Sequence, residues 1–458
     1  HDKQKESPMN HQPPPIQPVS VRIRESTTFK VFMIGFLVLI LLIPAGMIRS
    51  LVRERERRQG QVANEIGAKW GAWQSLSGPM LSIPYSHELP GPGGKKVTAT
   101  AYLHVLPDSL NITGTVAPEI RYRGIYETVL YNARVSLAAQ FTLPDLRALG
   151  IHEKRVQWDR VSLELGISDM KGVRKEIVAR AGDSAWPMEP GLTTSEVLDS
   201  GVSARVPVTR NTRTLQVTTE LDLNGSEQLS FVPVGKETSA ELSSTWRSPS
   251  FDGAFLPVRR KVSDAGFSAR WDILHLNRAY PQHWIGDRYK IADSAFGVGL
   301  LIPTDAYQKS ERTVKYAALF IALTFLSFFL SEVLLRVRLH PLQYLLIGLA
   351  LVIFYTLLLS ISEHLSFGRG YLIAGAATIA LVTGYAGSIL RKARAAWLVG
   401  SILAVLYGYL YVLLQLEDYA LLLGSIGLFV ILGTVMFLTR RINWYNPVRA
   451  ADSTGSQG

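Results

Sequence analysis

The chain contains no cysteine. It therefore has no disulfide, no thiolate nucleophile and no cysteine-based zinc site. A soluble domain within it must be held together by its apolar core, and the stretch 50–312 is long enough to bury one. The absence of cysteine also fits a bacterial periplasm.

Sequence motifs for catalysis and for nucleotide binding are also lacking. There is no HExxH and no GxSxG in a suitable context. The segment Gly91–Lys96 has a glycine-rich composition, but its spacing is wrong for a phosphate-binding loop. The sequence therefore predicts no catalytic residue, no metal ligand and no cofactor, and we expect a protein that is not an enzyme.

The net charge is +11. A basic chain can bind nucleic acid, but no zinc-finger spacing and no basic stripe with interleaved aromatic residues occurs here. Much of the positive charge lies beside apolar segments, where membrane topology requires it. Nucleic acid is therefore not an expected partner.

Long apolar runs are what the sequence has instead, at an overall hydrophobic content of 47%. A first run covers 29–48, and five more cover 316–335, 342–362, 371–390, 396–414 and 419–438. Each approaches the ~20 residues that a helix needs to cross a bilayer. The sequence predicts six transmembrane helices, the first an uncleaved anchor, with the lipid bilayer as a partner.

The orientation follows from lysine and arginine. With six spans both ends lie on one side, and that side carries thirteen positive residues, whereas the two short loops opposite carry only Arg369. The thirteen are Lys3, Lys5, Arg22, Arg24, Lys30, Arg336, Arg338, Arg391, Lys392, Arg394, Arg440, Arg441 and Arg449. This predicts both termini in the cytoplasm of a multi-pass inner-membrane protein.

One segment contradicts that orientation. Five arginines follow the first span directly, and they would lie outside: Arg49, Arg53, Arg55, Arg57 and Arg58. Reversing the first span would reverse all six, so we follow the majority and expect 50–312 in the periplasm.

The region between the first two spans has the alternation of β-strands. Alternating segments at 97–106, 110–116 and 267–276, and a turn at Gly91–Gly94, favour a sandwich. Leu215–Leu223, Asn224-Gly225 and Gln228–Val234 have the pattern of a hairpin with a two-residue turn. The predicted fold class is an α+β membrane protein with six transmembrane helices and a large β-rich, sandwich-like periplasmic domain. Its parts are a disordered tail 1–28, a span 29–48, a membrane-proximal helix 49–76, the β-rich domain 77–312, a five-helix bundle 313–441 and a tail 442–458.

Two helical faces leave alternatives open. In 49–76, Val62, Ile66, Trp70 and Trp73 share one face, which lies either on the lipid interface or on the soluble domain. In the spans, small residues recur every four positions at Ala376, Ala380, Gly384 and Ser388, and again at Gly400, Ala404 and Gly408. Such faces let helices approach closely, within the bundle by preference or in a homo-oligomer.

Polar residues inside membrane spans are costly and are candidates for function. Glu332 lies near the cytoplasmic end of the second span, where an ion pair with Arg336 is the simplest account. His340 and Gln343 lie at the same level. Glu363 and His364, at the outer end of the third span, are either a proton-relay pair or a polar helix end.

These residues coincide with the motifs of a known family. The chain resembles the CreD family of inner-membrane proteins from the first span to about Arg441. The motifs include Trp70-Gly71, Gly78-Pro79, Ile83-Pro84-Tyr85, Arg123-Gly124-Ile125-Tyr126, Pro249-Ser250-Phe251, Trp271, Leu276-Asn277-Arg278, His340-Pro341, Gln343-Tyr344 and Glu363-His364.

The resemblance implies a role in envelope integrity and in the envelope-stress response, and it carries over no catalytic residue. Two classes of function follow. The chain is either a membrane-anchored binding or scaffolding protein whose outer domain meets an unidentified envelope protein or cell-wall partner, or a carrier or enzyme acting on an envelope lipid or cell-wall precursor.

Overall fold

The computed structural model describes residues 27–90, 96–300, 302, 305–335, 339–390, 392–416 and 419–440. The chain divides into two compact units. The helical unit contains the chain up to Glu56 and from Thr304 onward, and the β-rich unit is Arg57–Pro303. Residues 1–26 of the predicted first tail, the predicted tail 442–458, the turn at Gly91–Gly94 and Arg336 lie outside the described residues, whereas Thr27 and Thr28 already belong to a helix.

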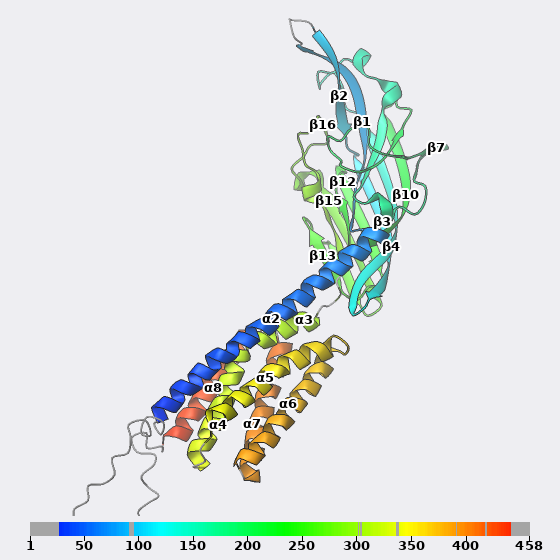
Figure 1. The fold of residues 1–458 in the computed structure, drawn as a ribbon. Coiled ribbons are helices and arrows are strands. Elements are labelled where there is room, and N and C mark those ends of the chain that lie inside the picture. The colour runs from blue at the N-terminus through cyan, green and yellow to red at the C-terminus, as the bar shows by residue number, and fades with distance from the viewer. Residues whose placement is uncertain are drawn as a thin grey trace, which may run out of the picture. The chain divides into compact units, whose positions relative to one another are not determined.

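Helix α2, Thr27–Trp70, supplies residues to both units (Figure 1). It ends earlier than the predicted position 76, because Gly71 has a φ of +148° and a Cβ there would lie 2.6 Å from the carbonyl oxygen of Asn224. The face predicted from its spacing packs on the β-rich unit: Val62 is buried, and Trp70 Nε1 donates to the carbonyl oxygen of Tyr131. Trp73 lies beyond the helix and is exposed.

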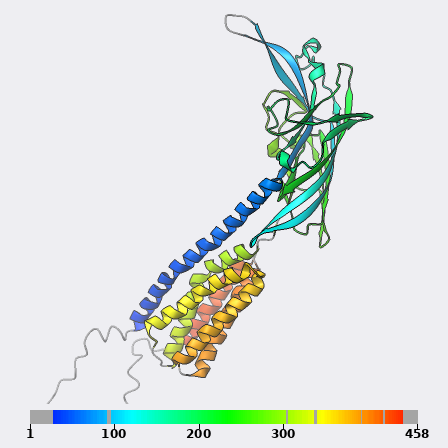
Figure 2. The same ribbon diagram turned by 45° about the vertical axis from the view of Figure 1, so that its right-hand side comes forward.

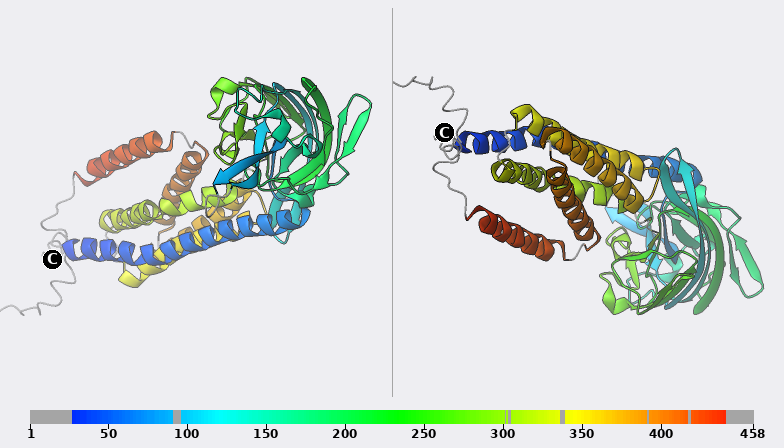
Figure 3. Two further views of the ribbon diagram at one scale, coloured as in Figure 1. Left: turned by 90° about the horizontal axis from the view of Figure 1, so that it is seen from above. Right: turned by 90° about the horizontal axis from the view of Figure 1, so that it is seen from below.

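The β-rich unit contains two mixed sheets, drawn in Figure 2 and viewed from above and from below in Figure 3. The nine-stranded sheet has the order β13-β17-β11-β1-β5-β9-β8, and β2 pairs with β1 and with β16. Its strands are β1 Gln74–Pro90, β2 Lys96–Val105, β5 Ser162–Ile167, β8 Glu189–Pro190, β9 Gly201–Arg205, β11 Gln228–Val232, β13 Pro249–Gly253, β16 His283–Ile285 and β17 Phe296–Leu300.

The eight-stranded sheet has the order β14-β15-β12-β3-β4-β10-β6-β7. Its strands are β3 Ser109–Arg123, β4 Tyr126–Thr142, β6 Val178–Ala181, β7 Ser184–Pro187, β10 Thr214–Ser226, β12 Glu237–Ser244, β14 Arg259–Ser263 and β15 Gly266–Leu274. Short 3-10 helices lie at Glu153–Arg155, Trp158–Arg160, Met170–Gly172, His275–Asn277 and Ala292–Ser294. The predicted strands at 97–106, 110–116 and 267–276 are confirmed as β2, part of β3 and β15.

The two sheets share one apolar core. Trp271 of the eight-stranded sheet is fully buried, and its ring centroid lies 5.5 Å from that of Phe296 and 5.9 Å from that of Phe251 in the other sheet. Its Nε1 donates to the carbonyl oxygen of Phe255. The aromatic motif residues around position 250 therefore stabilise the contact between the sheets.

The predicted hairpin at Asn224-Gly225 is wrong. Strand β10 continues through both residues to Ser226 and pairs with β4, while β11 belongs to the other sheet. The glycine is needed for packing, because a Cβ at Gly225 would lie 2.3 Å from Cζ of Tyr131. The chain changes sheet at Glu227, the one described non-glycine residue with a positive φ, at 60°.

The helical unit continues with α3 Asp305–Lys315, α4 Ala317–Leu335, α5 Pro341–Ser362, α6 Phe367–Leu390, α7 Ala393–Gln415 and α8 Ala420–Thr439. Five of the described helices are long and apolar enough to cross a membrane, and the number is six if α3 and α4, bent by 49° at their junction, count as one span. This agrees with the six predicted spans. The core is aromatic: Phe354 lies 4.8 Å from Tyr407 between ring centroids, and Tyr371 donates to the carbonyl oxygen of Tyr407.

The prediction that both small-residue faces pack within the bundle is wrong for most of their members. Ala376, Ala380, Gly384 and Ser388 are all exposed on α6. On α7 only Gly400 is buried, and a Cβ there would lie 2.6 Å from Oγ1 of Thr383, whereas Gly408 has no atom within 4 Å of that position. The α6 residues that do pack inside are shifted from the predicted face and include Ala374, Gly375 and Thr378.

Candidate functional site: a polar groove on the eight-stranded sheet

The five polar residues predicted in the membrane region divide between three places. Glu332 on α4 is buried, and it pairs with Lys30 of α2 and accepts from the hydroxyl of Tyr344 at 3.1 Å. Its partner is thus a lysine 302 residues away in sequence. This contact joins α2, α4 and α5.

His340 and Gln343 begin helix α5. The Nδ1 of His340 accepts from the backbone N–H of Leu342 at 3.2 Å, and the side chain of Gln343 accepts from the backbone N–H of His340 at 2.9 Å. Together with Pro341 at the first helical position they form a capping box. These contacts show that His340 and Gln343 stabilise the first turn of helix α5.

Glu363 ends helix α5 and lies 3.7 Å from Nε of Arg55, and it also accepts from the hydroxyl of Tyr307 at 3.4 Å. His364 is exposed, and its side chain makes no hydrogen bond or ion pair with the residues that the structure describes. The side chains of these two neighbours are therefore not hydrogen-bonded to each other.

A network of buried polar side chains lies within the nine-stranded sheet, and the sequence motifs did not indicate it. Ser82 on β1 donates to Glu164 on β5 at 2.9 Å and lies 3.2 Å from Nδ1 of His104 on β2. The other ring nitrogen of His104 lies 2.9 Å from Glu196. Burial lowers the pKa of His104, and Glu196 opposes that shift. Trp284 packs against the imidazole with 5.6 Å between ring centroids.

Serine, histidine and glutamate follow one another here as they do in a hydrolase triad. However, Ser82 and His104 have no exposed surface, and Glu164 is only 1% exposed. A substrate therefore has no access to the serine oxygen. The hydrogen bonds of this network link β1, β2 and β5 and so stabilise the nine-stranded sheet.

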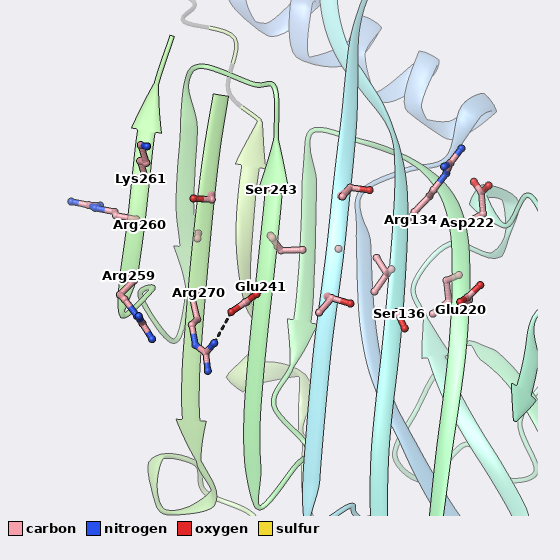
Figure 4. A pocket seen from close by; sticks show the side chains of 18 of the residues that line it. Arg134, Ser136, Glu220, Asp222, Glu241, Ser243, Arg259, Arg260, Lys261 and Arg270 are labelled. Atoms are coloured by element: carbon pink, nitrogen blue, oxygen red, sulfur yellow. Dashed lines mark hydrogen bonds and ion pairs between the residues drawn. The ribbon is translucent and has the colours of Figure 1, made fainter. Parts of the chain in front are cut away.

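An open groove of about 910 Å³ lies on the outer face of the eight-stranded sheet, and we call it the sheet groove (Figure 4). Strand register aligns its side chains in two rows across six strands. The first row is Arg259, Arg270, Glu241, Thr113, Ser136 and Glu220. The second row is Lys261, Ser268, Ser243, Thr115, Arg134 and Asp222.

Alternation explains why this face is polar. In a strand successive side chains point to opposite faces, and in β12 and β15 the neighbours Leu242 and Ala269 are buried in the core while Ser243 and Ser268 are exposed. The floor of the sheet groove therefore consists of short hydroxyl side chains.

Charges surround that floor. Arg270 binds both Glu241 and Asp272, and its hydrogen bond to Asp272 holds the pKa of that carboxyl below its usual range. At the other end the pKa of Asp222 is lowered, first by the hydrogen bond from Asn132 and then by Lys175 and Arg174. Arg134 and Lys261 make no ion pair or side-chain hydrogen bond with the described residues.

An apolar crevice of about 360 Å³ lies between α4, α7 and α8. Its lining includes Leu323, Leu410, Gly424 and Leu428. It offers almost no polar surface, so it carries no chemistry of its own beyond contact with lipid.

Comparison with known proteins agrees with this architecture. The family described as "Inner membrane protein CreD" matches residues 26–445. The chain is a member of the CreD family. The "Inner membrane protein CreD" of Escherichia coli (strain K12) is 33% identical over 421 residues, which is 89% of this chain and 91% of that protein. The chain is thus a multi-pass inner-membrane protein of the CreD family.

The sequence motifs did not predict the sheet groove. Its side chains come from six strands that span Thr113 to Arg270, and only the register between strands brings them together. The one local signal is the alternation of hydroxyl and apolar residues in β3, β12 and β15.

Proposed function

We propose that this CreD protein is a membrane-anchored binding protein that supports cell-envelope integrity and the response to envelope stress, and that it is not an enzyme. The sheet groove carries the proposal. It is an open concave surface of about 910 Å³, and its polar side chains converge from six strands on a rigid sheet. The helical unit serves as the anchor.

A groove-filling substitution tests this role. Thr115 is exposed at the centre of the groove, so Thr115→Trp should block it without disturbing the core. In cells that lack the native protein, this variant should fail to restore survival in detergent-containing medium when survival is normalised to membrane-inserted protein. Gln216→Trp is the matched control, because Gln216 is exposed on the same face outside the groove. Full protection by Thr115→Trp would contradict the proposal.

The proposal places the β-rich unit in the periplasm and both termini in the cytoplasm. The majority of the lysine and arginine residues supports this orientation. Among the outer arginines, Arg49 and Arg53 both bond to Glu311, and Arg55 lies beside Glu363. Acidic partners thus accompany the positive charges that argue for the opposite orientation. Reporter fusions after Gly150 should be active only outside the cytoplasm, and fusions after Lys392 only inside. A Gly150 fusion that is active in the cytoplasm would overturn the orientation.

A carrier function would require Glu332 or Glu363 to bind cargo or to change protonation during transport. Both carboxylates already have partners, Lys30 and Tyr344 for Glu332 and Arg55 and Tyr307 for Glu363. We therefore expect Glu363→Gln to preserve envelope protection at normal protein abundance.

A further inference from the structure

The sheet groove is elongated across the strands. Neighbouring strands lie about 4.8 Å apart, so its two rows of six side chains extend roughly 24 Å from β14 to β10. Along each strand the rows are two residues apart, which is about 7 Å. A long and narrow site of these dimensions fits a segment of an extended polymer better than a compact small molecule.

The floor of the groove is built from hydroxyl groups. Thr113, Thr115, Ser136, Ser243 and Ser268 all line it, and each hydroxyl can both donate and accept a hydrogen bond. A floor of this kind matches a ligand that is itself rich in hydroxyls. The short side chains also leave room for the ligand to approach the sheet.

The net charge of the groove lining is positive, because six lysine and arginine residues line it and only four acids do. Glu241 is bound by Arg270, and Asp222 is bound by Arg174 and Lys175, whereas Glu176 and Glu220 make no ion pair with the described residues. Lys261 and Arg134, at opposite sides of the hydroxyl floor, have no such partner among the described residues (Figure 4). Their separation by three hydroxyl-bearing strands suits a ligand with repeated negative groups.

Two other classes of macromolecule, nucleic acids and proteins, fit the sheet groove less well. The lining contains no aromatic side chain on which a nucleic-acid base could stack. Its exposed side chains also provide no apolar pocket for the aromatic or aliphatic anchors that dominate protein–protein binding.

We propose that the sheet groove binds an extended anionic polysaccharide. The cations Arg134 and Lys261 contact its negative groups, and the serine and threonine floor bonds to its sugar hydroxyls. The inference rests on the proposed function, since it names the class of envelope ligand that the groove holds.

The test uses the full-length protein in detergent and fluorescent dextran sulfate as the probe. Lys261→Gln and Arg134→Gln should each weaken binding severalfold, since one exposed charge contact changes affinity by up to about fivefold. Arg205→Gln is the matched control. Arg205 is an exposed arginine on β9 of the nine-stranded sheet, and it does not line the sheet groove.

A second pair of variants separates hydroxyl recognition from charge. Thr115→Val combined with Ser243→Ala removes two hydroxyls and no charge. It should weaken dextran sulfate binding and leave any binding of poly-glutamate unchanged, while neutral dextran of the same length should bind far more weakly than dextran sulfate to the unmodified protein.

The inference is overturned if dextran sulfate does not bind, if Arg205→Gln weakens binding as much as Lys261→Gln, or if poly-glutamate binds as tightly as dextran sulfate. Loss of cellular protection in Thr115→Trp together with any of these results would overturn the ligand class alone. Retained protection in Thr115→Trp would contradict the proposed function itself.

Discussion

His104 illustrates how a single buried side chain makes stability depend on pH. Its imidazole is fully buried beside Ser82, Glu196 and Trp284, and burial lowers its pKa in the folded protein. In the unfolded chain a histidine has a pKa of about 6.5. As the pH falls below that value, the unfolded chain binds a proton that the folded protein does not, so the free energy of unfolding decreases.

The melting temperature of the full-length protein, followed by tryptophan fluorescence, should therefore fall between pH 7 and pH 5. His104→Gln should flatten this dependence, because the titrating group is removed. His152→Gln, which removes an exposed histidine, should retain the slope of the parent protein. An equal slope in His104→Gln and the parent would assign the acid sensitivity to other groups.

The pair formed by Lys30 and Glu332 has a different energetic character, because it lies in the membrane-spanning part of the chain. The Glu332 side chain is 7% exposed and that of Lys30 is 27% exposed. Removing one partner leaves an uncompensated charge in a medium that cannot hydrate it.

Lys30→Met should therefore destabilise the helical unit by about 3 to 5 kcal/mol, the usual penalty for breaking a buried pair. The double variant Lys30→Met with Glu332→Gln should recover most of that loss, since no unpaired charge remains. Detergent-resistance melts of the single and double variants measure the difference. If the double variant is as unstable as Lys30→Met, the loss comes from packing of the lysine stem and not from charge.

At the scale of helices, close packing depends on which glycines face a neighbour. A Cβ added at Gly348 on α5 would lie 2.1 Å from Cδ1 of Leu41 and 2.9 Å from Cζ of Phe325. At Gly384 on α6 no atom lies within 4 Å of that position. The two residues are both glycines in apolar helices and differ only in their surroundings.

Gly348→Leu should lower the thermal stability of the protein in detergent, because overpacking costs about 1 to 3 kcal/mol and separates α2 and α4 from α5. Gly384→Leu should leave the melting temperature close to that of the parent. Comparable losses in both variants would mean that the α6 face is covered, as it would be in a homo-oligomer.

The strands and helices show which parts of the fold can be predicted from one sequence. Alternation located β2, β3 and β15, and apolar length located every span, because both patterns are local. The turn expected at Asn224-Gly225 failed because a glycine that makes room for Tyr131 has the same sequence signature as a glycine in a turn. The partner of Glu332 was missed because Lys30 is distant in sequence, whereas the expected partner Arg336 is one helical turn away.

The sheet groove could not be predicted from the sequence, because it depends on contacts between strands that are distant in the chain. Each strand shows that one face is polar, but not which residues of different strands are opposite one another. Glu241 meets Arg270 on one side and Thr113 on the other only because β12 pairs antiparallel with β15 and parallel with β3. A shift of one residue would send each side chain to the other face.

At the scale of the whole molecule, the boundary between the units determines what can fold alone. The β-rich unit begins at Arg57, inside α2, and not at position 77 as the strand signals suggest. Gln74 donates to the carbonyl oxygens of Asp169 and Asn224, and Leu76 pairs with Phe231 of β11. Residues before 77 thus take part in the sheet and in its hydrogen bonds.

A fragment of residues 57–303 should therefore give a β-type circular dichroism spectrum and a cooperative melt. A fragment of residues 77–303 should melt at a lower temperature, because it lacks Gln74 and most of the parallel pairing of β1 with β11. Identical melts for the two fragments would show that the end of α2 contributes nothing to the stability of the unit.

The strand order of the nine-stranded sheet also determines how late in synthesis the sheet can be completed. Strand β1 leaves the ribosome first, yet its parallel neighbour β11 follows about 150 residues later, and β17 pairs with β11 only after that. At ~5–20 residues per second, roughly 10 to 50 seconds pass between synthesis of β1 and of β17. During that interval the apolar side chains of β1 have no complete sheet to join, and such non-local pairing folds slowly. Nascent β1 therefore depends on protection from aggregation until the chain has been made almost to Leu300.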